Sequence, residues 1–271
     1  MKIIKILIVP LFLMFLSCVE VVDVDLNTAA PRLVIDASLK WEKGTSGNSQ
    51  SIRLSTTTGY FAPEIPTVSG ASVVVTDSQN NIFSFIESED GLYVCNNFAP
   101  VIDEVYTMTV IVNGQTYVAT ETLRSVPEID SVTQSEDGGF TGDEREVRIT
   151  FTDDGTTDDF YLFSFNSPAE PYPVYGVQED RLIQGNQSFE AYSDENLESG
   201  DLMTLYMGGI SQRYYNYLRV LLSISGGGGG SPFQSPPATV RGNIVNTTNA
   251  DDYALGYFSI IEIDVETVVI E

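Results

Sequence analysis

Residues 105–123 read VYTMTVIVNGQTYVATETL, and this stretch decides the fold class. Two runs rich in β-branched and aromatic residues, each of strand length, flank the dipeptide Asn113-Gly114. Both turn residues tolerate the positive φ of a type I′ turn, so the pair is a strong signal of a β-hairpin. Neither run has the apolar spacing of a helix. The stretch therefore predicts two antiparallel strands joined by a tight turn.

Runs of the same kind precede the hairpin from residue 31 onward, each bounded by turn residues. They are PRLVIDASLKW, QSIRLSTT, ASVVVTD, NIFSFIE and GLYV. About seven strands in about 95 residues indicate an immunoglobulin-like β-sandwich over residues 31–125. Cys95, which follows the GLYV run, is expected to be a small buried apolar residue.

The pattern changes after Ser125, where Pro127 interrupts it, and we place a domain boundary at this point. New strand runs follow, namely EVRITFTD, DFYLFSFN, PVYGV, ATVRGNIVN and ALGYFSIIEIDVETVVI. Residues 126–271 are therefore expected to form a second, sandwich-like β-rich domain.

One segment of this second domain has a helical pattern. Apolar side chains recur at positions i, i+3, i+4 and i+7 of a single face: Tyr214, Tyr217, Leu218 and Leu221. This spacing predicts one packed α-helix near residues 211–222. A glycine- and proline-rich loop, residues 226–237, follows the helix.

The amino-terminal segment has the pattern of an export signal. Two lysines precede an apolar run, residues 6–16, that is about half as long as a bilayer-spanning helix. Cys18 follows, and the string LFLMFLSC resembles a bacterial lipobox, in which the cysteine is acylated and becomes the first mature residue. We expect residues 1–17 to be removed and lipid on Cys18 to anchor the protein in a membrane. The alternative is an unmodified cysteine in a signal peptide that is cut elsewhere.

The composition excludes several classes of function. The chain of 271 residues carries a formal net charge of −25, so nucleic acid and anionic membrane surfaces repel it. With 42 % hydrophobic residues, it is still apolar enough to fold. It has no histidine, which removes Ser-His-Asp and Cys-His catalysis, histidine-ligated zinc and the commonest general base. We therefore expect a protein that is not an enzyme and has no cofactor.

One dense acidic segment, TDDGTTDD, follows the run EVRITF. Its four carboxylates are candidates for a calcium site, although their spacing is not that of an EF-hand: Asp153, Asp154, Asp158 and Asp159. Turns favour Asp and Gly for backbone reasons alone, so we interpret the segment as a solvated hairpin loop without a metal. A hydrolase that uses two carboxylates stays open as a further alternative, because acidic residues are abundant.

Aromatic residues provide the candidates for ligand or partner contact. Tyr172 and Tyr175 lie in the segment EPYPVYG, whose prolines would present aromatic faces at low entropic cost. Tyr215 lies off the apolar face of the helix, where we expect exposure, and Phe233 lies in the loop after the helix. Ordinary packing is the competing interpretation for the tyrosines. Exposed aromatic rings would suit a sugar or peptide ligand.

Several segments, taken in order, resemble one known family. The lipobox cysteine is followed by PRLVIDASL, IRLSTTTGYF, VSGASVVVTDSQNN, GLYV, SQRYYNYLRVLL, GGSPFQSPPATVRGNI and ALGYFS. Each motif alone is common in β-proteins, and the order and spacing carry the resemblance. From Cys18 to at least Ser259, the chain resembles the Bacteroidota lipoprotein family called domain of unknown function 4249 (DUF4249).

The resemblance implies an outer-membrane lipoprotein of a family without an established activity. Members tend to be encoded beside TonB-dependent outer-membrane transporters, which implies such a transporter as a partner. In Bacteroidota, acidic residues after the lipidated cysteine can direct lipoproteins to the cell surface, and Glu20, Asp23 and Asp25 lie in the tether, residues 18–30. We therefore favour the cell-surface face over the periplasmic face. The tripeptide DSV also matches a short Bacteroidota O-glycosylation pattern, so Ser131 is a candidate modification site.

The sequence leads to one main hypothesis about function and one rival. The main hypothesis is a non-enzymatic outer-membrane lipoprotein that assists a TonB-dependent transporter in nutrient capture or uptake. The rival is an adhesion or structural lipoprotein that projects from the cell without a transporter partner. In the main hypothesis, the second domain makes the distinctive contacts.

Overall fold

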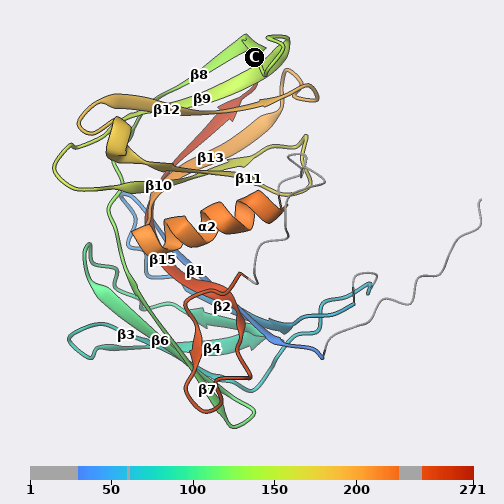
Figure 1. Cartoon of the computed structure of the whole chain (residues 1–271), viewed down its shortest axis with the longest axis vertical. Helices are drawn as coiled ribbons and strands as arrows, with labels where there is room; N and C mark the ends of the chain where they lie inside the picture. The colour runs from blue at the N-terminus through green and yellow to red at the C-terminus, as the bar shows by residue number, and fades with distance from the viewer. Residues whose placement is uncertain (1–29, 60–61, 226–239) are drawn as a thin grey trace, which may run out of the picture. The chain divides into compact units, whose positions relative to one another are not determined.

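Strands make up most of the structure, a computed structural model that describes residues 30–59, 62–225 and 240–271 (Figure 1). The first half contains β1 (Leu33–Glu42), β2 (Gln50–Thr56), β3 (Ser72–Thr76), β4 (Ile82–Glu89), β5 (Leu92–Cys95), β6 (Val105–Val112) and β7 (Gln115–Thr122). The second half contains β8 (Ile129–Gly138), β9 (Glu144–Thr152), β10 (Phe160–Asn166), β11 (Val174–Glu179), β12 (Gln187–Asp194), β13 (Leu202–Gly209), β14 (Val245–Asn246) and β15 (Leu255–Val269). The described residues also form one α-helix, α2 (Gln212–Ser225), and one 3-10 helix, η1 (Asp180–Leu182). The predicted mainly β fold with one packed helix is thus confirmed.

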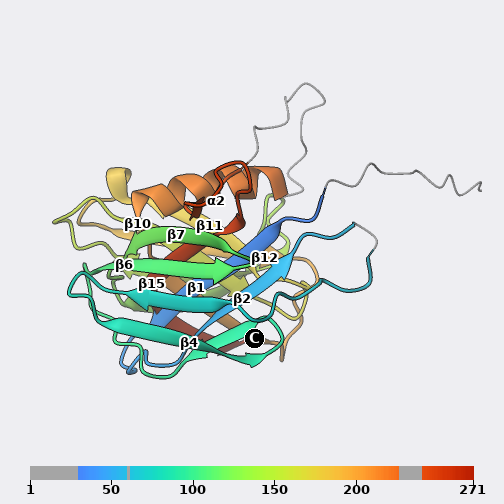
Figure 2. The ribbon, with the colours of Figure 1, turned by 90° about the horizontal axis from the view of Figure 1, so that it is seen from below.

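The hairpin that decides the fold class has the predicted turn. Asn113 and Gly114 have φ values of 50° and 74°, the left-handed conformation that a type I′ turn requires. Val112 pairs with Gln115, and the antiparallel pairing continues along both strands. Figure 2 shows β6 and β7 side by side. The turn dipeptide therefore accounts for the register of this pair.

The first core lies inside a sheet that folds over on itself. β4 pairs with β3 through its first half and with β5 through its second half, where a bulge between Glu87 and Glu89 interrupts the register. As a result, β1, β2 and β5 face β3, β6 and β7 across one apolar core. Leu39 and Met108 are fully buried in this core, and Cys95 is buried at a strand end, as predicted.

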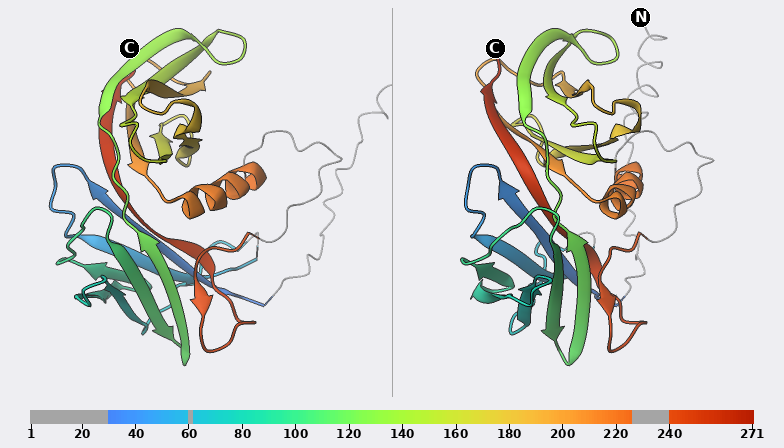
Figure 3. Two further views of the ribbon diagram at one scale, coloured as in Figure 1. Left: turned by 60° about the vertical axis from the view of Figure 1, so that its left-hand side comes forward. Right: turned by 90° about the vertical axis from the view of Figure 1, so that its left-hand side faces the viewer.

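β15 connects the two halves of the chain. Its amino-terminal part pairs in parallel with β1, and its carboxyl-terminal part pairs with β13 (Figure 3). Phe258 and Ile260 of β15 belong to the first core, together with Ile244. The chain therefore passes from the first core to the second near Ser125. A division at this residue does not separate the two halves, because one 12-stranded sheet includes strands from both. Pro31–Glu271 form one compact unit.

The second core lies between the three-stranded sheet β12-β9-β8 and strands β10 and β13 of the large sheet. Phe151, Phe163 and Met207 are fully buried there. Three of its strands, β8, β12 and β13, occupy segments for which the sequence predicted no strand. β9 and β10 belong to different sheets, so the acidic segment between them connects two sheets. The predicted hairpin at this position is wrong.

α2 packs on the face of the large sheet opposite the second core, beside β15 (Figure 3). Its buried residues are Tyr214, Tyr215 and Leu218. Tyr217 and Leu221 pack at the edge of the same cluster, as the helical spacing predicts. The expected exposure of Tyr215 is wrong. Its side chain is 7 % exposed because Phe160 packs against it, with 5.1 Å between the ring centroids.

Several sequence predictions concern residues outside the described part of the chain. They are the signal peptide over residues 1–17, lipidation of Cys18, the acidic tether, and the loop 226–237 with Phe233. Among the residues that are described, no helix combines the length and apolar character needed to cross a bilayer.

Candidate functional site

A large groove lies beside α2. It has a volume of about 920 Å³ and lies between the helix and the polar face of β1, β2 and β5, with residues of β10, β11 and β13 at one side. We name it the helix groove, and its characteristic side chains are Asp36, Lys40, Arg53, Tyr175, Tyr206 and Tyr214. Its volume is in the range of roughly 300–1,000 Å³ that is typical of small-molecule sites.

Strand β1 supplies the floor of the helix groove. Asp36, Ser38 and Lys40 point to the groove and alternate with residues that are fully buried in the first core. Arg53 of β2 stands opposite Asp36 in the antiparallel register, so it lies on the same face. The pleat of a central strand thus delivers charged and hydroxyl groups to a concave surface that the helix covers.

Tyrosines line the side of the helix groove. Tyr175 comes from β11, Tyr206 from β13 and Tyr214 from α2. The Lys40 Nζ lies 4.7 Å from the centroid of the Tyr206 ring, which is a cation–π contact. Burial raises the pKa of Tyr206 to about 12 and also raises the pKa of Tyr175. Both phenols therefore keep their protons at neutral pH and can donate hydrogen bonds.

Within the described residues, neither cation of the helix groove forms an ion pair with a carboxylate. Six ion pairs occur in the described parts of the chain, and none of them includes Lys40 or Arg53. Asp36 is the acidic member of the groove lining. The lining therefore has a formal charge of +1, from two cations and one carboxylate, in a chain whose net charge is −25.

Of the residues that the sequence predicted to contact a ligand or partner, the structure places one in the helix groove. Tyr175 lines the helix groove, whereas Tyr172 is 79 % exposed in the β10–β11 connection and does not line it. Tyr215 is buried, and Phe233 is not in the described part of the chain. Ser131 is exposed on β8, and its glycosylation stays a prediction.

Sequence reasoning missed four of the characteristic side chains of the helix groove: Asp36, Lys40, Arg53 and Tyr206. A signal for the first three was present, because β1 and β2 both alternate between apolar and polar residues. A strand with one polar face lies either at the surface or along a binding site, and the sequence alone does not distinguish these cases. Tyr206 lies in β13, for which no strand was predicted.

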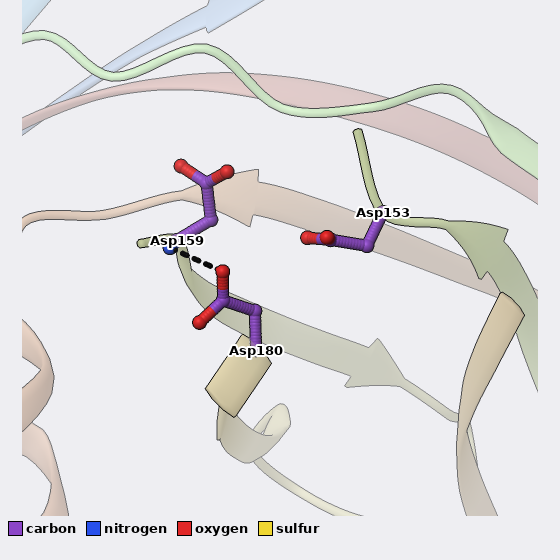
Figure 4. A group of neighbouring side chains, drawn as sticks. All are labelled: Asp153, Asp159 and Asp180. Atoms are coloured by element: carbon purple, nitrogen blue, oxygen red, sulfur yellow. Dashed lines mark hydrogen bonds between the residues drawn. The ribbon is translucent and has the colours of Figure 1, made fainter. Parts of the chain in front are cut away.

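The acidic segment contributes two residues to a cluster of three carboxylates, of which Asp153 and Asp180 are buried and Asp159 is half-buried. Asp153 and Asp159 meet Asp180 of η1, with one oxygen from each carboxylate within 4.8 Å of the others (Figure 4). Asp154 and Asp158 are exposed and remain outside this acidic cluster. The expectation of a solvated loop is wrong for Asp153, which is 2 % exposed, because the loop folds back onto the connection between β11 and β12.

Internal donors satisfy much of the acidic cluster. Asp153 accepts a hydrogen bond from the Tyr161 hydroxyl and two from backbone N–H groups, at 3.0 and 2.6 Å. Asp180 accepts one from the Asp159 N–H at 2.8 Å (Figure 4). Burial, together with the neighbouring carboxylates, raises the pKa of Asp159 and of Asp180. Oxygen ligands of this kind suit calcium, but the hydrogen bonds already explain the cluster as a junction between the two sheets.

Comparisons with other proteins give one extensive match. The family profile described as "Domain of unknown function (DUF4249)" matches residues 19–267. No curated protein matches the chain. Similar solved structures include a two-domain fibronectin type III segment of chicken tenascin, with 10 % identity, a TM-score of 0.22 and coverage of 67 % of this chain and 91 % of that chain. A DUF4785 family protein from Legionella pneumophila has 10 % identity, a TM-score of 0.26 and coverage of 66 % and 51 %.

Proposed function

The chain belongs to the family described as domain of unknown function 4249, and on this premise we propose that it is a non-enzymatic outer-membrane lipoprotein that captures a small ligand. The observation that carries the proposal is the helix groove, with its volume of about 920 Å³ and its aromatic and cationic lining. Concave sites with a few convergent polar groups are the usual location of ligand binding.

The anchor and the partner rest on the sequence and on the family resemblance. The apolar run before Cys18 and the lipobox pattern support lipidation of that residue. The occurrence of family members beside TonB-dependent transporters supports a transporter as the partner. In this proposal the lipoprotein sits on the outer membrane, with the surface face favoured, and presents the captured ligand to the transporter.

Two observations support a role without catalysis. The chain contains no histidine, which is the commonest general base near neutral pH. The buried carboxylates of the acidic cluster accept hydrogen bonds from within the fold, as expected of groups that hold two loops together.

Ligand capture can be tested by placing a large side chain in the helix groove, where it would block binding. Ser51 of β2 is exposed on the groove floor, and Ser84 of β4 is equally an exposed strand serine but does not line the groove. Extracts of the purified full-length protein are analysed by mass spectrometry for retained small molecules. We expect the same compound from the wild type and from the matched control Ser84→Trp, and its loss from Ser51→Trp. Identical extracts from all three proteins would contradict capture in the helix groove.

The test of the partner uses the membrane form. A tagged full-length protein is extracted from its own membranes with a gentle detergent, and the co-purifying proteins are identified. We expect a TonB-dependent transporter with the wild type, and we expect Cys18→Ser to appear in the soluble fraction. A membrane-bound Cys18→Ser variant would contradict the anchor. A wild-type protein that never brings down a transporter would favour the adhesion or structural alternative.

A further inference from the structure

We propose that the helix groove selects a small anionic amphiphile, a molecule with one carboxylate, sulfonate or phosphate group on a planar or apolar body. This inference rests on the proposed function, because it names the chemistry of the ligand for the same groove. It follows from the placement of charge, aromatic rings and aliphatic side chains along the groove.

The charge of the helix groove differs in sign from that of the whole chain. Lys40 and Arg53 lack a carboxylate partner in the described structure, while the chain has 38 acidic residues against 13 basic ones. In a surface so rich in carboxylates, a groove whose lining carries two cations and one carboxylate, Asp36, is a local site for negative charge. An anionic ligand that avoids the rest of the surface is attracted to this position.

The Lys40 end of the groove provides the contacts for the acidic group. The ammonium lies over the Tyr206 ring at 4.7 Å and is half-buried, so it has lost part of its hydration. Tyr175 lines the same groove, and burial raises its pKa as it does that of Tyr206, so both phenols remain protonated donors. Charge-assisted hydrogen bonds to a partly desolvated ammonium are about twice as strong as neutral ones.

The remainder of the groove suits an apolar body. Leu218, Leu221 and Leu222 of α2 line one side, and Leu92 and Val94 of β5 line the floor. Aliphatic side chains of this kind bind a planar or apolar group by burial, without directional bonds. Arg53 lies about 13 Å from Lys40 along the strand direction, at roughly 3.3 Å per residue over four residues of register, and adds attraction at longer range.

The test uses two fluorescent probes that share one ring system. The anionic probe is 1-anilinonaphthalene-8-sulfonate, and the neutral probe is N-phenyl-1-naphthylamine, which lacks the sulfonate. Both are titrated into the full-length protein in detergent at low ionic strength. We expect the wild type to bind the sulfonate more tightly, and Ser51→Trp to abolish binding of both probes.

Variants of the two groove cations then test the selectivity for the anionic probe. We expect Lys40→Met to weaken binding of the sulfonate about tenfold, Arg53→Gln to weaken it about two- to threefold, and Lys40→Arg to retain it, with the neutral probe unaffected by each. The matched control is Arg181→Gln, which removes one positive charge from η1, where the Arg181 side chain is 77 % exposed. Circular dichroism confirms that each variant is folded.

Each result has a distinct meaning. Equal binding of the two probes, with no effect of Lys40→Met, would overturn the anionic selectivity and leave the proposed ligand groove standing. The same loss in Arg181→Gln as in Lys40→Met would also overturn it, because it would show an effect of net charge alone. Failure of both probes to respond to Ser51→Trp would overturn the groove itself as the binding site.

Discussion

The two faces of β1 have opposite compositions within one strand. The face toward the first core carries Ile35, Ala37 and Leu39, each 0 % exposed. The face toward the helix groove carries Asp36, Ser38 and Lys40. Because side chains alternate along a strand, one backbone can contribute to stability on one side and to binding on the other. Substitutions at neighbouring positions should therefore have separable effects.

The largest effect is expected on the apolar face. Leu39→Ala removes a fully buried side chain and leaves a cavity, so we expect a loss of about 2–5 kcal/mol in the free energy of unfolding. The control on the opposite face, Asp36→Asn, should change it by less than about 0.5 kcal/mol, because Asp36 is exposed and belongs to none of the ion pairs of the described residues. Chemical denaturation measures both. Similar losses in the two variants would show that the two faces are not separable.

A smaller loss in the free energy of unfolding is expected at β15, the strand next to β1, where a charged residue is buried. Glu262 of β15 is 6 % exposed, accepts a hydrogen bond from the Val126 N–H at 3.0 Å and pairs with Lys43 at 3.2 Å. Glu262→Ala leaves the N–H without an acceptor, so we expect a loss of about 1–3 kcal/mol. Glu262→Gln keeps an acceptor oxygen and should lose less in the same denaturation assay. Equal losses in the two variants would mean that Glu262 stabilises the fold through its charge and not through the hydrogen bond from the Val126 N–H.

Charged side chains usually lie at the protein surface, but two carboxylates of the acidic cluster, those of Asp153 and Asp180, are buried. Asp180→Asn keeps an oxygen to accept the Asp159 N–H and removes one of three neighbouring carboxylates. We expect a gain of about 1 kcal/mol at neutral pH, or roughly 2–4 °C in Tm. Differential scanning calorimetry measures the change.

The pH dependence of this variant gives an independent check. The folded-state pKa values of Asp159 and Asp180 are raised above 3.8, so these groups favour folding most below that pH and lose the contribution as the pH rises. The advantage of Asp180→Asn over the wild type should therefore be largest at pH 7 and shrink toward pH 4. An advantage that grows on acidification would contradict the raised pKa.

The smallest effect on stability is expected on the groove face. Arg53 is exposed and makes no ion pair within the described structure, so Arg53→Gln should change the free energy of unfolding by less than about 0.5 kcal/mol. Thermal denaturation measures this difference. A loss above 1 kcal/mol would mean that the groove face also supports the fold.

Local signals in the sequence were sufficient for most strands and for the helix. Asn113-Gly114 specifies its turn through backbone conformations that few residue pairs adopt, and the spacing of Tyr214 and Leu218 specifies a helix face. β8 was missed because its residues are mostly polar and exposed, so the strand depends on pairing with β9. The burial of Tyr215 was missed because Phe160, which packs against it, comes from a distant strand.

The candidate site was less accessible to sequence reasoning than the fold. Lys40 and Tyr206 meet only because β15 inserts between β1 and β13, and no local pattern specifies that order. Asp180 joins Asp153 through a turn in a different connection. Such contacts depend on which strands pair over long sequence separations, and the sequence specifies this through the whole fold.

The position of β15 also has a consequence for the time course of folding. Val34 pairs with Leu255, so this contact closes a loop that includes most of the chain. Closing such a loop is slow, because its entropy must be lost before any pairing energy is gained. Until β15 is available, β1 and β13 are open edges with unpaired backbone groups, which favour association with other chains. During folding, the chain is therefore expected to be most prone to association before β15 has paired with β1 and β13.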